Sequence, residues 1–171
     1  MTLLRHLLAV AALPFVVTVV IPVWLARQNS IAVRVGAGPL ILLQLLGAII
    51  LGTGLLLFAA SLRRFATEGE GTLAPWDPPR QLVVRGPYRY VRNPMISGVL
   101  LVLIGESLVL LSGPHMGWAL TFFVINAVYI PLLEEPQLAA RFGASYETYR
   151  RHVPRLIPRI RPWEPHTHDP A

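Results

Sequence analysis

The sequence predicts an all-α, polytopic membrane protein with four transmembrane helices and a cytosolic interfacial C-terminal helix, in a single domain over residues 1–171. Two observations support this prediction. The chain is 54% hydrophobic and only 14% charged, whereas about a quarter of the residues in a soluble domain are charged. Its apolar residues are also concentrated in four uninterrupted runs, and these runs are longer than those of ordinary core helices, which indicates membrane spans.

The four apolar runs define the expected spans. The two shortest runs contain 18 residues each, and as helices they would be about 27 Å long, just enough to cross the hydrocarbon core. Pro14 and Pro22 should kink the first span. Ala48 and Gly52, with Gly47 and Gly54 nearby, have the spacing of small residues that lets helices approach closely in lipid. The expected spans are residues 7–26, 39–60, 94–111 and 116–133, with a long loop over residues 61–93.

All 15 cations are arginines, and their distribution predicts the orientation. With four spans, 13 of them fall on the side that holds both termini and the long loop. Because arginine-rich loops face the cytoplasm, we expect an integral protein of the bacterial inner membrane with both termini in the cytoplasm. The same bias accounts for the pI of about 10.7, so we expect no nucleic-acid partner. The sequence has no cysteine and no histidine spacing that predicts a metal site.

A helical pattern of apolar residues follows the fourth run. It predicts an amphipathic helix over about residues 135–152 that packs on the membrane surface or on the helix bundle. Gly143 should bend this helix. The prolines that follow end regular structure, and residues 163–171, from Trp163 onward, are expected to be disordered. The shared face consists of Leu138, Phe142, Tyr146, Tyr149 and Val153.

Two polar clusters flank the last two apolar runs. Arg92 and Asn93 precede the third run, and Glu134 and Glu135 follow the fourth, 42 positions later. A hairpin of two spans returns the chain to its starting side, so we expect the clusters to meet at one membrane surface. Adjacent carboxylates at that boundary need cationic or hydrogen-bonding partners. The clusters therefore form either a ligand site or a salt bridge that locks the hairpin.

Glu106 is an ionisable residue inside the third run. Such a residue is a functional hypothesis by default, and Asn126 on the fourth run is a candidate partner. Glu106 lies far from the end that carries the polar clusters, so we do not expect it to act in catalysis.

At these residues the chain resembles the membrane methyltransferases that include isoprenylcysteine carboxyl methyltransferases and phospholipid N-methyltransferases. The similarity lies in two blocks and covers about half of the chain. The blocks are Gly86-Pro87-Tyr88-Arg89-Tyr90-Val91-Arg92-Asn93-Pro94 with Gly98, and Glu134-Glu135 with Leu138, Phe142-Gly143, Tyr146, Tyr149 and Val153-Pro154-Arg155.

The resemblance implies S-adenosylmethionine as the cofactor, bound at the cytosolic membrane face, and a lipophilic acceptor that enters from the bilayer. It nominates Arg92 and Asn93 as catalytic residues, and it implies no metal. Asn93 departs from the histidine found in many relatives and cannot titrate near neutrality, and Ile96 departs from a common tyrosine. The implied cofactor-binding residues are Tyr88, Arg92, Asn93, Glu134, Glu135 and Tyr146.

Two other functions fit the same residues. One is an NADPH-dependent membrane reductase related to the sterol reductases, whose C-terminal region ends in a similar acidic and aromatic pattern. The other is a non-enzymatic membrane module in which both polar clusters are structural locks. The sequence alone leaves the acceptor open among carboxylates, thiols and amines.

Overall fold

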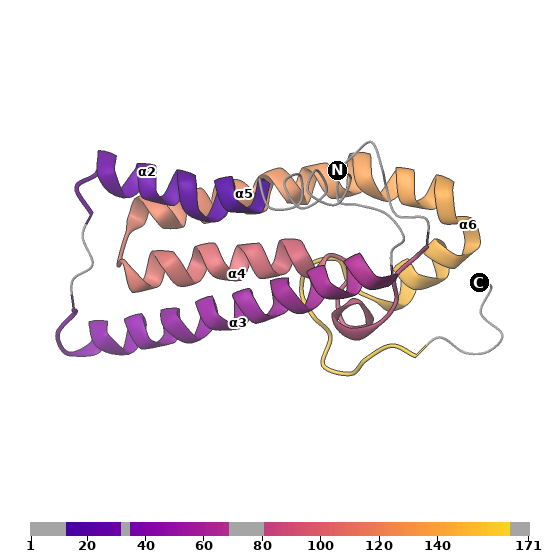
Figure 1. Ribbon diagram of the computed structural model, residues 1–171, viewed down its shortest axis with the longest axis horizontal. Coiled ribbons are helices and arrows are strands. Elements are labelled where there is room, and N and C mark those ends of the chain that lie inside the picture. The colour runs from indigo at the N-terminus through magenta and orange to yellow at the C-terminus, as the bar shows by residue number, and fades with distance from the viewer. Residues whose placement is uncertain (1–12, 32–34, 69–80, 165–171) are drawn as a thin grey trace.

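The chain forms an elongated bundle of helices (Figure 1). The computed structural model describes residues 13–31, 35–68 and 81–164, and every secondary-structure element in these ranges is a helix, as expected. Helix α4 lies between α3 on one side and α2 and α5 on the other (Figure 1). The elements are η1 (Val16–Val20), α2 (Ile21–Gln28), α3 (Pro39–Glu68), η2 (Gly86–Arg89), α4 (Pro94–Val109), α5 (Gly113–Tyr129), η3 (Ile130–Glu134) and α6 (Glu135–His152).

Two of the described helices are long and apolar enough to cross a membrane, namely Pro39–Phe65 and Gly113–His152. Leu13–Gln28 and Pro94–Val109 are apolar but shorter, so the topology of four spans stays a prediction. The start of the first expected span lies outside the described residues. Much of the apolar surface of α3 is uncovered, with Leu42 67% and Leu56 74% exposed, as expected for a surface that faces lipid.

Helices α3 and α4 pack backbone against backbone through four glycines. Gly47 and Gly54 on α3 meet Gly98 and Gly105 on α4. A Cβ atom on Gly105 would lie 2.6 Å from the backbone nitrogen of Leu51, and one on Gly54 would lie 2.8 Å from the carbonyl oxygen of Gly98. Small residues permit such contact, and in a membrane this contact is a main source of helix association.

The small-residue contact expected at Ala48 and Gly52 lies on another face of α3, because Gly47 and Gly54 make it. Gly52 has no atom within 4 Å of the position that its Cβ would occupy, and Ala48 is exposed. The expected end of the helix at Ala60 was also too early, because α3 continues to Glu68. Charged residues end the apolar run there, but arginine favours the helical conformation and does not interrupt it.

Two short π-helices, η1 and η3, interrupt the α-helices, and a proline follows each. In the π pattern the carbonyl of residue i accepts from the N–H of residue i+5, so Pro22 leaves the carbonyl of Val17 free. The indole N–H of Trp118 donates to that carbonyl at 3.0 Å. The imidazole of His115 makes a second hydrogen bond, in which its Nε2 lies 3.1 Å from the carbonyl oxygen of Pro22. These bonds attach η1 and α2 to α5.

The second π-helix joins α5 to α6 in one helix of 40 residues, Gly113–His152. Its straight part, up to the break at Gly143, would be about 45 Å long, roughly one and a half times the hydrocarbon thickness. Only its apolar part, up to Leu133, is therefore the candidate span, and the polar part from Glu134 onward extends beyond it. The bend expected at Gly143 is confirmed, because this residue has φ 51° and ψ −129°.

Residues 153–164, here called the C-terminal segment, fold back across the residues that precede α4. The backbone N–H of Arg92 donates to the carbonyl of Pro154 at 2.8 Å, and that of Trp163 donates to the carbonyl of Arg89 at 2.9 Å. The expectation that disorder begins at Trp163 was wrong, because its side chain is 9% exposed and stacks on His152. Residues 165–171 of the expected tail lie outside the described residues.

Candidate functional site

The two polar clusters meet at the end of the bundle where α6 lies. Nη1 of Arg92, just before α4, is 3.0 Å from Oε1 of Glu135, at the start of α6. Both side chains are withdrawn from solvent, with 9% and 5% of their surface exposed. The hairpin of α4 and α5 therefore joins residues that are far apart in the sequence, as expected.

Arg155 is a second cation on Glu135, although it is not among the site residues expected from the sequence. Its Nε and Nη2 donate to the two carboxylate oxygens of Glu135 at 2.7 and 3.1 Å. Arg150 is a more distant partner at 4.0 Å. The residue was visible in the Val153-Pro154-Arg155 block, but its role depends on the return of the C-terminal segment.

The cations decide the charge state of Glu135. Burial by itself would raise the pKa of this carboxyl, but the hydrogen bond from Arg155 and the charges of Arg92, Arg155 and Arg150 hold it below its ordinary value. Glu135 is therefore an ionised carboxylate that is already satisfied by its arginine partners.

The lowered pKa of Glu135 predicts an acid-sensitive fold. A carboxyl with a depressed pKa stabilises the folded state above its unfolded pKa, and this contribution is lost as the pH falls through the depressed value. We expect the wild type to lose more stability than Glu135→Gln when unfolding is compared at neutral and acidic pH. If the free energy of unfolding changed equally with pH in the two proteins, the lowered pKa assigned to Glu135 would be contradicted.

The neighbouring Glu134 differs from Glu135 both in its partners and in the direction in which its pKa is shifted. Among the residues that the structure describes, none makes a hydrogen bond or an ion pair with its half-buried carboxylate. Burial and then the charge of Glu135 raise its pKa, and the charge of Arg92 opposes the rise. Of the two adjacent acids, Glu135 pairs with arginines and Glu134 retains free acceptor capacity.

The tyrosines of the site act mainly as supports. The Tyr146 hydroxyl accepts from Nη1 of Arg92 at 3.3 Å, and its side chain is 2% exposed. The Tyr149 hydroxyl donates to the carbonyl of Tyr88 at 2.7 Å. Burial and the charge of Glu134 raise the pKa of Tyr88, so this phenol stays protonated at neutral pH.

Asn93 holds the C-terminal segment. Its backbone N–H and its side-chain Nδ2 both approach the carbonyl oxygen of Arg155, at 3.1 and 3.4 Å. Its own carbonyl accepts from the backbone N–H and the hydroxyl of Ser97. These bonds give Asn93 a positional role, and its catalytic role stays a prediction.

Glu106 lies about 20 Å from the polar cluster, because 14 positions of mostly helical chain separate it from Arg92. Its Oε2 is buried and has no hydrogen-bond partner among the described residues. The Asn126 amide donates to the carbonyl of Phe122, and Oε2 of Glu106 receives no hydrogen bond from it.

Comparison with known proteins identifies the family. The sequence model described as "Phospholipid methyltransferase" matches residues 42–145, which is more than half of the chain. The chain belongs to the phospholipid methyltransferase family. The family match runs from α3 into α6 and contains Arg92, Glu134 and Glu135, so the resemblance seen in the sequence is confirmed. Family membership and the two long apolar helices support a membrane location for this phospholipid methyltransferase family member.

Two curated relatives are similar over a shorter region. "Methanethiol S-methyltransferase 2" of Bradyrhizobium diazoefficiens is 38% identical over 76 residues, which is 43% of this chain and 27% of the relative. "Methanethiol S-methyltransferase" of Crocosphaera subtropica is 37% identical over 73 residues, 43% of this chain and 28% of the relative. The matched part of this family member thus spans little more than a quarter of either relative. No solved structure matches the chain.

Proposed function

We propose that the protein is an S-adenosylmethionine-dependent methyltransferase that acts on a lipophilic acceptor at the cytosolic face of the bacterial inner membrane. The observation that carries the proposal is the contrast between the two adjacent acids. Arg92 and Arg155 neutralise Glu135, whereas Glu134 has no partner among the described residues. Family membership supports methyl transfer as the reaction.

The free polar groups of the cluster fit the donor molecule. S-adenosylmethionine carries ribose hydroxyls and an ammonium group, which are donors that the Glu134 carboxylate would accept. It also carries a carboxylate. Nε of Arg92 is a buried donor without an acceptor among the described residues. An anionic group of the ligand placed on that side of Arg92 would accept the missing hydrogen bond. Glu135 and Tyr146 would hold Arg92 in place for this role.

Bound there, S-adenosylmethionine supplies an electrophilic methyl group on a sulfonium centre. The protein's residues would fix the donor and shield it from water, and orientation alone accounts for several kcal/mol in such reactions. The site offers little for removing a proton from the acceptor. Asn93 does not titrate, Tyr88 stays protonated, and Glu134 would be engaged by the donor. This favours an acceptor that arrives as an anion.

A thiolate and a lipid carboxylate are the two acceptor classes that meet this requirement. The names of the two relatives, both methanethiol S-methyltransferases, make a thiol the first class to test. In either case the methyl carbon leaves the sulfonium sulfur, which keeps the bonding electron pair, and bonds to the acceptor's anionic atom. Incubation of membranes with labelled methyl donor and each acceptor class would show which product carries the label.

Replacing Glu134 with glutamine is expected to weaken S-adenosylmethionine binding by about tenfold or more, because charge-assisted hydrogen bonds to the donor are lost. The measurement is binding of radiolabelled donor to the purified full chain. The folded state should be no less stable, since the Glu134 charge is itself costly to bury. Glu147→Gln, which changes a more exposed acid on α6, is the matched control.

The same assay separates the alternatives. Unchanged donor affinity in both the Glu134→Ala and Glu135→Ala proteins would remove the proposed site. Binding of NADPH in place of S-adenosylmethionine would favour a reductase. Binding of neither cofactor by the folded wild-type protein would favour a non-enzymatic membrane module.

A further inference from the structure

The C-terminal segment presents two large apolar side chains to its surroundings. Ile157 is 80% exposed and Ile160 is 97% exposed, the largest exposed fraction among the large hydrophobic residues described. Neither belongs to a helix that is a candidate span. Leaving side chains of this size in water forgoes the favourable free energy of burial, so their exposure needs an explanation.

The segment lies at the depth where the apolar helices begin. The hydroxyl of Ser97, in the first turn of α4, donates to the carbonyl of Leu156 at 2.7 Å. The neighbouring Gly98 packs against Phe58, close to the end of the apolar run of α3. Because α4 has 16 residues and is about 24 Å long, its first turn falls at or inside the boundary of a hydrocarbon core of about 30 Å.

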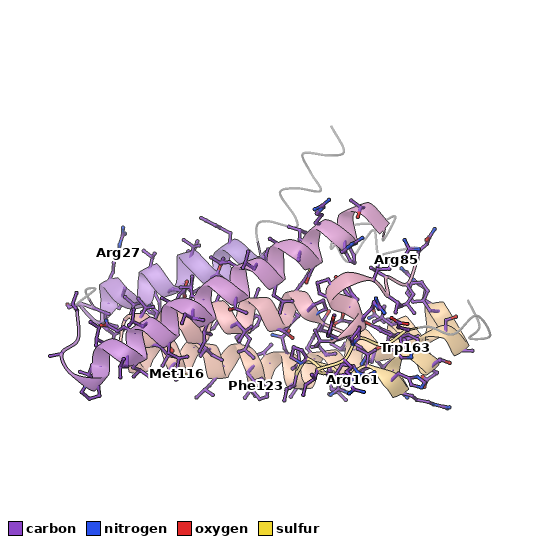
Figure 2. The ribbon with its side chains drawn as sticks, turned by 90° about the horizontal axis from the view of Figure 1, so that it is seen from below. Arg27, Arg85, Met116, Phe123, Arg161 and Trp163 are labelled. Atoms are coloured by element: carbon purple, nitrogen blue, oxygen red, sulfur yellow. The ribbon has the colours of Figure 1, made fainter. Side chains whose placement is uncertain are left out.

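The charges around the isoleucines are positive. Arg159 and Arg161 flank Ile160 in the sequence, and Arg161 is exposed. The acid of the segment, Glu164, pairs with Arg89 at 2.6 Å. Figure 2 shows Arg161 and Trp163 toward the end of the molecule where Arg85 lies, with Arg27 at the opposite end. The surface that carries the exposed isoleucines is thus suited to anionic headgroups.

We propose that residues 156–161 are an interfacial anchor for an anionic lipid leaflet. Ile157 and Ile160 insert below the headgroups, and Arg161, with Arg159 beside it, faces lipid phosphates. The anchor continues directly from Arg155, so contact with lipid steadies the segment that supplies one of the cations on Glu135. This inference depends on the membrane location and not on the reaction that the site performs.

The absence of cysteine from the chain allows a direct test with single labelled cysteines. Ile157→Cys and Ile160→Cys change exposed side chains, so the fold should be kept. Each variant of the full chain is labelled with an environment-sensitive fluorophore and placed in phosphatidylglycerol or phosphatidylcholine vesicles. The matched control is Ala144→Cys, which is exposed and lies just after the bend at Gly143, about 15 Å along the helix from Leu133.

In phosphatidylglycerol, labels at 157 and 160 should show blue-shifted emission and quenching by lipid-borne nitroxides, whereas the label at 144 should be quenched by aqueous iodide. Adding Arg161→Gln should lower the ratio of inserted to exposed label at 160 about fivefold, since an arginine near an anionic surface contributes about 1 kcal/mol. Labels at 157 and 160 as open to iodide as the label at 144 would overturn the proposal. Shielding from both quenchers would overturn it in favour of a protein partner, and equal insertion in both lipids would overturn the anionic part.

Discussion

Replacing Glu135 with alanine is expected to lower the free energy of unfolding by about 3–5 kcal/mol, the usual cost of removing one partner of a buried ion pair. The Arg92 side chain is 9% exposed and would keep its charge with only the Tyr146 hydroxyl as a described side-chain partner. Arg155 would lose both of its bonds to the carboxylate. Chemical unfolding of the purified chain in detergent, followed by circular dichroism, measures the change.

The matched control for this variant is Glu147→Ala. Glu147 lies on the same helix and pairs with Arg150 at 2.9 Å, but its side chain is 37% exposed. Exposed ion pairs contribute between about 0 and 1 kcal/mol, so this change should be nearly silent. Equal destabilisation by the two variants would mean that the buried cluster does not hold the polar end of the bundle together.

Replacing Gly105 with valine is expected to prevent α3 and α4 from packing. The added Cβ would sit 2.6 Å from the backbone nitrogen and 2.7 Å from the Cα of Leu51, and backbone atoms cannot rotate away as a side chain can. The cost should reach or exceed the about 1–3 kcal/mol that is typical of overpacking. The yield of folded protein and its thermal unfolding midpoint in detergent both measure the loss.

Gly52→Val is the control for this second change. It places the same side chain on α3 at a position with open space around it, so it should leave folding close to that of the wild type. A loss of folding as large as that caused by Gly105→Val would show that helix propensity, rather than contact between α3 and α4, limits the fold.

The sequence was sufficient for the features that depend on long regular patterns. Apolar runs located α2, α3, α4 and α5, since burial and membrane insertion both act on such runs. The sequence also predicted that Arg92 lies close to Glu135, because two apolar runs joined by a turn form a hairpin whose two ends meet. Gly143 was recognised as a bend because a glycine inside a helical pattern weakens the helix there, and the structure gives this residue the positive φ that glycine adopts readily.

The sequence was insufficient where the fold depends on contacts between backbone atoms. Residues 153–164 are rich in proline and follow no periodicity, yet their carbonyls accept hydrogen bonds from Arg92 and Asn93. Carbonyl groups are present at every residue, so no side-chain pattern marks such a pairing. For this reason Arg155 was missed as a partner of Glu135 and Trp163 was mistaken for the start of a disordered tail. The close contact on α3 was likewise expected at Gly52, whereas the structure has it at Gly54 against Gly98, because several glycines on α3 offered alternative faces.

The segment that completes the polar cluster is the last part of the described chain to be synthesised. Arg155 and Trp163 leave the ribosome after every helix that they bind. The helices are therefore available for threading into the bilayer while Glu135 still lacks Arg155. A chain that ended between His152 and Pro154 would accordingly carry all of the described helices, but its Glu135 would pair with Arg92 and Arg150 alone among the described cations.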